Sequence, residues 1–480
     1  MEYSGSRTHE RQQNDATEEN QTSYISTIQT RIETSTIVST KAPEPQPQNS
    51  EEDWGFGATR VYFVVDENEP LVKEWHNGLR LAVLETLKQE NKNEWRSVDV
   101  LRTGYYDCSV HKNEVSIIIT VVQGAQNSFW RDIAWSLHQE CLKRNLPEVA
   151  ILIINGDVEF LNTTDQIISE QYQICTLGAS IGVNPLPGED PASGSLAGYV
   201  MAAVDGEEKL FGMTCHHVIK STGHKEACPM KNPTNPQVFS PSLEDRNITI
   251  KSCEATIQHL QGLLENAMER AKSRGCEDCS KDSVVQKHIN TIEKLKSRLN
   301  EEKEFEPLFG RVFVSSGFRT SLENQGLDWA LLECNKKRIG DQPNEFAPHK
   351  KYLSFIPGED FVSGTEKPLV GNQVFKFGRS TDFSVGIVNP LESEINKPEF
   401  EKPLQQRCYI RLPGTTSFGE KGDSGSWAIS MTGRVCGLIF LKRDHGPVYA
   451  TDYNVIKEDI EKMTGLKVYL PGVTEEMEDF

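Results

Sequence analysis

The chain has 480 residues, a formal net charge of −19 at pH 7 and a hydrophobic content of 37%. This length predicts two or three domains rather than one. The acidic balance argues against a nucleic-acid partner, because such surfaces need Lys and Arg to neutralise phosphates. No stretch reaches the roughly 18 to 20 apolar residues of a membrane span, and residues 1–50 contain no apolar run typical of a signal peptide. We therefore expect a cytoplasmic protein without a membrane partner.

Cysteine usage agrees with a reducing compartment. The chain contains 11 Cys, an odd number that does not favour a framework of disulfides.

Residues 1–53 are rich in Ser, Thr, Gln and Glu and end in a Pro-containing stretch. A segment of this composition cannot bury enough apolar surface to offset its ordering entropy. We predict a disordered tail here.

Residues 54–160 show regular alternation of strand and helix patterns. The predicted strands are Val61–Val65, Ser97–Gly104, Glu114–Val122 and Val149–Ile154, and the predicted helices are Pro70–Gln89 and Phe129–Arg144. This β-α-β-β-α-β order predicts a ferredoxin-like α+β domain. It contains no catalytic constellation, so a regulatory or docking role is the expectation.

A linker is predicted over residues 161–177, an all-β domain over 178–468 and an acidic tail over 469–480. Within the all-β domain, residues 250–304 carry a helical pattern. Two heptad seams run through it, formed by Ile257, Leu260, Leu264, Ala267 and Ala271, and by Val285, His288, Ile292, Leu295 and Leu299. They predict an antiparallel helical hairpin that inserts into the domain and could dock a partner protein.

Cys276 and Cys279 stand at the predicted tip of this hairpin. A zinc site needs four ligands, and the helix rise of about 1.5 Å per residue places Cys253 and His288 too far away. We predict no metal site.

Three short motifs carry the chemistry. His216 and His217 follow a short strand pattern, Asp328 opens the apolar run Trp329–Leu332, and Ser424 lies in the pentapeptide Gly422–Ser426. A serine becomes a nucleophile when an imidazole accepts its proton and a carboxylate orients that imidazole. The order His, Asp, Ser differs from the orders in α/β-hydrolases and subtilisins.

These motifs resemble those of the chymotrypsin/trypsin-like serine endopeptidases. The resemblance covers residues 178–468 and implies a double β-barrel. It makes His217 the general base, Asp328 its partner and Ser424 the nucleophile, with an oxyanion hole at the N–H groups of Gly422 and Ser424.

The same resemblance places Phe418 at the base of the primary specificity pocket and Phe440, Lys442 and Pro447 on its walls. No aspartate stands at that base, so cleavage after Lys or Arg is not supported. Ile181 partly echoes the N-terminus that activated family members pair with an aspartate, here Asp423.

We therefore interpret the sequence as an intracellular serine endopeptidase that acts on protein or peptide substrates and needs no cofactor. The alternative is a catalytically silent protease-like scaffold that binds proteins. A regulatory partner could dock on the N-terminal domain or on the hairpin, and the oligomeric state stays open.

Overall fold

The structure is a computed structural model. It describes residues 36–40, 61–90, 94–104, 113–124, 127–161, 173–184, 193–220, 225–276, 278–346, 360–412, 415 and 417–473. The described residues form two compact units. The N-terminal unit contains those up to Val158 together with Asn389–Lys397 and Arg443–Pro447, and the barrel unit contains the rest.

The N-terminal unit contains one sheet and two helical segments. Its elements are β1 (Thr36–Ser39), β2 (Val61–Phe63), α2 (Pro70–Glu74), η1 (Trp75–Leu79), α3 (Arg80–Glu90), β3 (Trp95–Gly104), β4 (Glu114–Val121), α4 (Asn127–Lys143), β5 (Ala150–Asn155) and β19 (Ser393–Ile395). The first helical segment kinks at Gly78, whose φ of 105° favours glycine.

The order of strands and helices from β2 to β5 is the predicted one, but the ferredoxin-like pairing is wrong. That fold needs a strand between the two parallel strands of each split βαβ unit. Here β4 and β5 are parallel direct neighbours, and β2 and β3 are antiparallel neighbours. Hydrophobic periodicity predicts which segments are strands and does not specify which strands pair.

Two further strands complete this sheet. β1 pairs antiparallel with β5, and β19 pairs with β3. β1 lies within the segment predicted as a disordered tail, so that prediction is wrong for residues 36–40. β19 comes from the region assigned to the protease domain, where its short sequence gave no sign of its partner.

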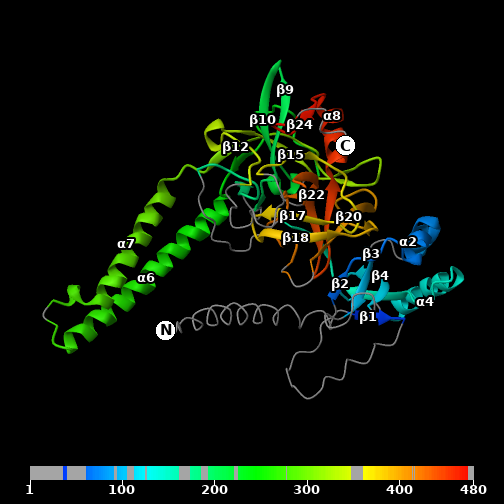
Figure 1. Cartoon of the computed structure of the whole chain (residues 1–480), viewed down its shortest axis with the longest axis horizontal. Helices are drawn as coiled ribbons and strands as arrows, with labels where there is room; N and C mark the ends of the chain where they lie inside the picture. The colour runs from blue at the N-terminus through cyan, green and yellow to red at the C-terminus, as the bar shows by residue number, and fades with distance from the viewer. Residues whose placement is uncertain are drawn as a thin grey trace, which may run out of the picture. The chain divides into compact units, whose positions relative to one another are not determined.

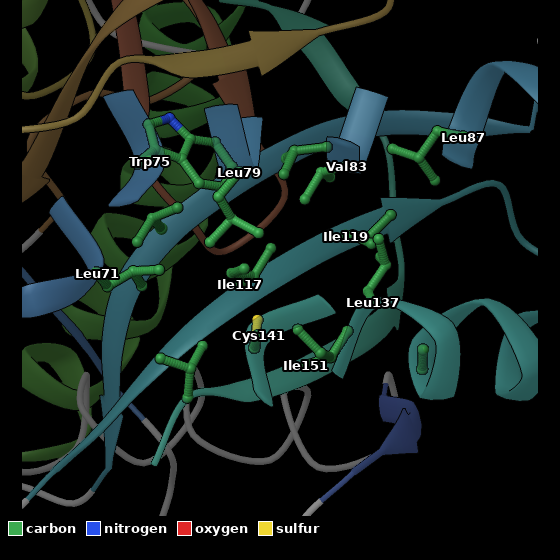
Figure 2. Packing of buried hydrophobic residues seen from close by; sticks show 14 of the residues in the cluster. Leu71, Trp75, Leu79, Val83, Leu87, Ile117, Ile119, Leu137, Cys141 and Ile151 are labelled. Atoms are coloured by element: carbon green, nitrogen blue, oxygen red, sulfur yellow. The ribbon is translucent and has the colours of Figure 1, made fainter. Parts of the chain in front are cut away.

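The core of the N-terminal unit lies between the helices and one face of the sheet. Ile117, Ile119 and Ile151 alternate along β4 and β5 and meet Leu79 and Leu137 of the helices (Figure 2). Because both helical segments contribute to one cluster, both cover the same sheet face.

The barrel unit contains two barrels. The first consists of β7 (Ser180–Val183), β8 (Ser193–Ser195), β9 (Gly198–Val204), β10 (Glu207–Thr214), β11 (Gln237–Phe239), β12 (Leu308–Ser315), β15 (Ala330–Cys334) and β24 (Val468–Tyr469), ordered β24-β9-β10-β15-β12-β11-β7-β8. β8 leads almost directly into β9, so the two strands form one continuous stretch. This stretch pairs with β7 at its start and with β10 further on, and these two pairings close the barrel.

The second barrel is a closed ring of six antiparallel strands. They are β17 (Gln373–Gly378), β18 (Asp382–Val388), β20 (Leu404–Arg411), β21 (Trp427–Ser430), β22 (Arg434–Arg443) and β23 (Val448–Asp452), and β23 pairs with both β22 and β20. The short β16 (Gly364–Thr365) adds to β22, and α8 (Tyr453–Thr464) follows β23. Smaller elements are β6 (Val158–Phe160), α5 (His216–Ile219), η3 (Cys279–Lys281), β13 (Arg319–Thr320), β14 (Gly326–Leu327) and η4 (Lys336–Arg338).

The predicted hairpin is present as α6 (Leu243–Ser273) and α7 (Ser283–Glu304), which run side by side away from the barrels (Figure 1). The predicted seam positions are the buried or half-buried ones in both helices. α6 begins before the predicted residue 250, because Ser242 caps it by accepting the N–H of Asp245.

The predicted linker and the predicted absence of a membrane span concern single segments of the chain. Cys175 and Leu177, predicted to lie in a linker, are buried in the barrel unit. In the part of the chain that the structure describes, no helix is both long and apolar enough to cross a membrane.

Candidate active site

His217 and Asp328 come together through neighbouring strands of the first barrel. β10 pairs with β15 so that Thr214 lies opposite Ala330, and the two residues sit just beyond these positions. His217 Nδ1 lies 2.5 Å from Asp328 Oδ2, and the His217 backbone N–H donates to Asp328 Oδ1 at 3.0 Å. This arrangement places the ring proton on Nδ1 and leaves Nε2, which is buried and has no hydrogen-bond partner, able to accept a proton.

His216 is held differently. Its Nδ1 lies 2.9 Å from Ser315 Oγ, and its ring meets Phe318 edge-on. The His217 ring, in contrast, lies at hydrogen-bond distance from the Asp328 carboxylate.

Ser424 lies in a tight turn between β20 and β21 that packs on the first barrel. Gly425 has a φ of 92°, and a Cβ there would lie 2.3 Å from the Ser195 carbonyl oxygen, so only glycine fits. Ser195 donates its N–H to the Ser424 carbonyl at 2.8 Å and its hydroxyl to the Gly422 carbonyl at 2.9 Å. The Ser424 hydroxyl donates to the Phe440 carbonyl at 3.2 Å.

Asp423, inside the same turn, forms a buried ion pair with Lys376 of β17. Lys376 Nζ lies 2.9 Å from Asp423 Oδ2, and both side chains are 0% exposed. The carboxylate also accepts the N–H groups of Glu420, Ser380 and Thr381.

Electrostatics keep Asp423 ionised. Burial alone would raise the pKa of this carboxyl, but Lys376 and the surrounding N–H donors hold it below its ordinary value. Burial lowers the pKa of the Lys376 ammonium, and Asp423 opposes part of that change.

This pair corrects the expectation for Ile181. Ile181 lies within β7, is fully buried and pairs opposite Gly194. The cation beside Asp423 is Lys376, so the turn does not draw its counter-charge from a new N-terminus at Ile181.

A second buried ion pair connects the hairpin insertion to this turn. The Arg379 guanidinium binds the Asp245 carboxylate at the start of α6, with Nε 2.6 Å from Oδ2. The Arg379 backbone N–H donates to Ser195 Oγ, whose hydroxyl in turn donates to the Gly422 carbonyl. A chain of contacts therefore runs from the base of the hairpin to the Ser424 turn.

The cleft beside these residues is filled by the chain itself. The Leu161 carbonyl accepts the N–H groups of both Gly422 and Ser424, the second at 3.4 Å. The Leu161 N–H donates to the Phe440 carbonyl at 3.1 Å. The Phe160 ring packs on His217 with centroids 4.5 Å apart. The predicted base and nucleophile thus contact the same dipeptide from its two ends.

The predicted pocket residues have different positions. Phe418 belongs to the same apolar cluster as the Leu161 side chain, and Phe440 contributes its carbonyl. Lys442 is bound to Glu420 at 2.6 Å. Pro447 accepts the Arg443 N–H in a turn of the N-terminal unit, so nothing supports its assignment to the pocket wall.

A cavity of about 720 Å³ lies elsewhere on the barrel unit, and its lining includes Lys220, Asn232 and Arg311 but none of the three triad candidates. The cleft is not hollow, because Phe160 and Leu161 occupy it.

Metal ligation is the remaining possibility for these side chains. Among the described residues, one group of potential ligands lies close together, namely Cys215, His217 and Asp328. Burial raises the pKa of the Cys215 thiol far above its ordinary value, so the thiolate that a metal needs is disfavoured. The group is better explained as a His–Asp pair beside a buried thiol.

The sequence interpretation missed Lys376, Phe160 and Leu161. Lys376 had a detectable signal, because it is a charged residue between Phe375 and Phe377 in a strand of otherwise apolar pattern. Phe160 and Leu161 lay at the boundary between a predicted domain and a predicted linker, where no local motif marks them.

No protein-family model and no curated protein matches the chain. Solved structures do. Protease A of Thermobifida fusca is 11% identical, with 62% of this chain and 100% of that chain covered and a TM-score of 0.31. Nocardiopsis protease is 12% identical, with 61% and 97% covered and a TM-score of 0.28, and Cellulomonas bogoriensis chymotrypsin is 18% identical, with 33% and 74% covered and a TM-score of 0.22.

The structures that this chain resembles are chymotrypsin/trypsin-like serine proteases.

Proposed function

We propose that this protein is a serine endopeptidase that hydrolyses peptide bonds through Ser424, His217 and Asp328. The observation that carries the proposal is the convergence on one dipeptide. The ring of His217, oriented by Asp328, lies against Phe160, and the N–H groups of Gly422 and Ser424 hold the next carbonyl.

The mechanism follows from these positions. Ser424 Oγ attacks the carbonyl carbon of the bound peptide, and His217 Nε2 accepts the hydroxyl proton. The N–H groups of Gly422 and Ser424 stabilise the oxyanion. His217 then donates the proton to the leaving amine, and water cleaves the acyl-enzyme by the same route in reverse.

Asp328 keeps the His217 ring in one tautomer and stabilises the imidazolium. In this structure the Ser424 hydroxyl donates to the Phe440 carbonyl, so a rotation about its Cα–Cβ bond precedes attack. The chemistry requires neither a metal nor an organic cofactor.

A fluorophosphonate probe tests the proposal, because it reacts with activated serines. Labelling is measured on the wild-type full chain and on the Leu161→Asp variant. A carboxylate at position 161 disfavours burial of this side chain in the apolar pocket and so opens the cleft. We expect labelling that is lost in Ser424→Ala and in His217→Ala.

The control is Ser426→Ala in the same turn, which should keep its labelling. Absence of labelling in both the full chain and Leu161→Asp would instead favour the protein-binding scaffold.

A further inference from the structure

Residues 159–161 lie in the cleft in the manner of a bound substrate. The Leu161 carbonyl takes both N–H donors of the oxyanion hole, and its N–H donates to Phe440 on β22. A carbonyl so placed is the one that a nucleophile at Ser424 attacks. The residue that follows in the chain is Asn162.

The side chain of Leu161 fills an apolar pocket of the second barrel. It is 1% exposed and clusters with Phe418, Ile439 and Val448. Its Cδ1 lies 3.7 Å from the position of a Cβ built on Gly419, an ordinary van der Waals separation, so Gly419 forms part of the pocket wall. The described residues of this cluster are all hydrophobic, which favours an uncharged apolar residue before the cleaved bond.

The neighbouring positions are also complementary. The Phe160 ring lies between His217 and Phe318, with centroids 4.5 Å and 5.1 Å away, and it is 4% exposed. Glu159 pairs with Lys421 at 2.6 Å. Phe160 therefore contacts the proposed base itself, and Glu159 contacts the segment that leads into the Ser424 turn.

We propose that this protein cleaves itself between Leu161 and Asn162, and that its substrates are peptides with an apolar residue before the cleaved bond and an aromatic residue before that. The inference rests on the proposed endopeptidase function and names the substrate class of that site.

The self-cleavage step balances as a hydrolysis. Ser424 Oγ forms a bond to the Leu161 carbonyl carbon, and the bond to the Asn162 nitrogen breaks as His217 protonates that nitrogen. Water then releases a carboxylate at Leu161 and restores the Ser424 hydroxyl. The products are a chain that ends at Leu161 and a chain that begins at Asn162.

Intact-mass measurement and N-terminal sequencing of the purified full chain test the proposal. We expect wild type to yield the two products and Ser424→Ala to stay uncut. Leu161→Asp should abolish the cut while the fluorophosphonate probe still labels Ser424, and Leu161→Met should retain it. Leu142→Asp, an exposed leucine of α4, is the matched control and should be cut like wild type.

Specificity is tested separately with synthetic peptides in trans. A peptide containing Glu-Phe-Leu-Asn should be cleaved after Leu, and replacing that Leu by Lys should abolish cleavage. Phe318→Ala should raise KM for this peptide by about threefold to tenfold, the value of one aromatic contact. It should leave a peptide with Ala in place of Phe unaffected.

The outcomes separate the two proposals. A protein that is labelled by the probe and cleaves peptides, yet leaves Leu161–Asn162 intact or cuts Leu161→Asp equally well, overturns the inference and leaves the endopeptidase function standing. If neither wild type nor any variant is labelled by the probe or cleaves peptides, both the self-cleavage and the endopeptidase proposals are overturned.

Discussion

His217 and Asp328 lie just beyond the paired ends of adjacent strands of the first barrel and contact each other directly, whereas the Ser424 turn is held by groups outside the proposed triad. The first pair needs one strand pairing and two hydrogen bonds. The turn depends on Lys376 and on Ser195, which is far away in sequence. The His217–Asp328 pair therefore depends on one strand pairing and a direct contact, whereas the Ser424 turn depends on several supporting groups.

The largest effect is expected from Asp328→Asn. The amide cannot hold the Nδ1–H tautomer of His217, so kcat should fall about 10⁴-fold while the fold stays intact. Steady-state kinetics on the Glu-Phe-Leu-Asn peptide measure this, and circular dichroism checks the fold.

Asp459→Asn is the matched control for this change, because Asp459 binds Trp329 and Arg319 outside the cleft. Its kcat should be close to that of wild type. If Asp328→Asn leaves kcat undiminished, the contact between His217 and Asp328 does not contribute to catalysis.

An intermediate effect is expected from Lys376→Met, which leaves the Asp423 carboxylate buried without its cation. Breaking a buried pair in this way costs about 3 to 5 kcal/mol, measurable as a lower free energy of unfolding in urea. The displaced turn should also lower kcat/KM by about 10²-fold, as a shift near 1 Å can.

The double variant Lys376→Met with Asp423→Asn isolates the charge. It should recover stability relative to Lys376→Met alone, because no uncompensated carboxylate remains. If the single variant unfolds no more easily than wild type, the turn does not depend on this pair.

The smallest effect concerns acid pH. The pKa of Asp423 is lower in the folded chain than in the unfolded one, so its contribution to stability is complete above the unfolded value of about 3.9 and is lost as the pH falls through the folded value. Wild type should therefore lose stability more steeply below about pH 4 than the double variant does. Urea unfolding midpoints at a series of pH values measure the difference, and parallel curves would contradict it.

The parts of the molecule that sequence predicted share a local origin. Heptad spacing marks Ile257 and Ile292 as seam residues, and both are buried between α6 and α7. The motifs around His217, Asp328 and Ser424 are short, and the strand pairings of the barrels bring them to one cleft.

The parts that sequence missed depend on contacts between distant segments. β4 and β5 are parallel neighbours, which the predicted ferredoxin-like order does not allow. Strand pairing is decided by tertiary packing and not by local sequence. The partner of Asp423 is Lys376, and the occupant of the cleft is Leu161. Neither choice is encoded within a window of a few residues.

The position of Leu161 in the cleft affects how this protein binds other substrates. Because the occupant of the cleft belongs to the same chain, it is present at a local concentration that dilution does not change, of millimolar order for short flexible tethers. An external peptide must displace it, so its apparent affinity is reduced by the fraction of molecules whose cleft is open. Cleavage of other proteins would therefore begin only after Leu161 has left the cleft. The rate of that step would be first order in enzyme, because it takes place within one molecule.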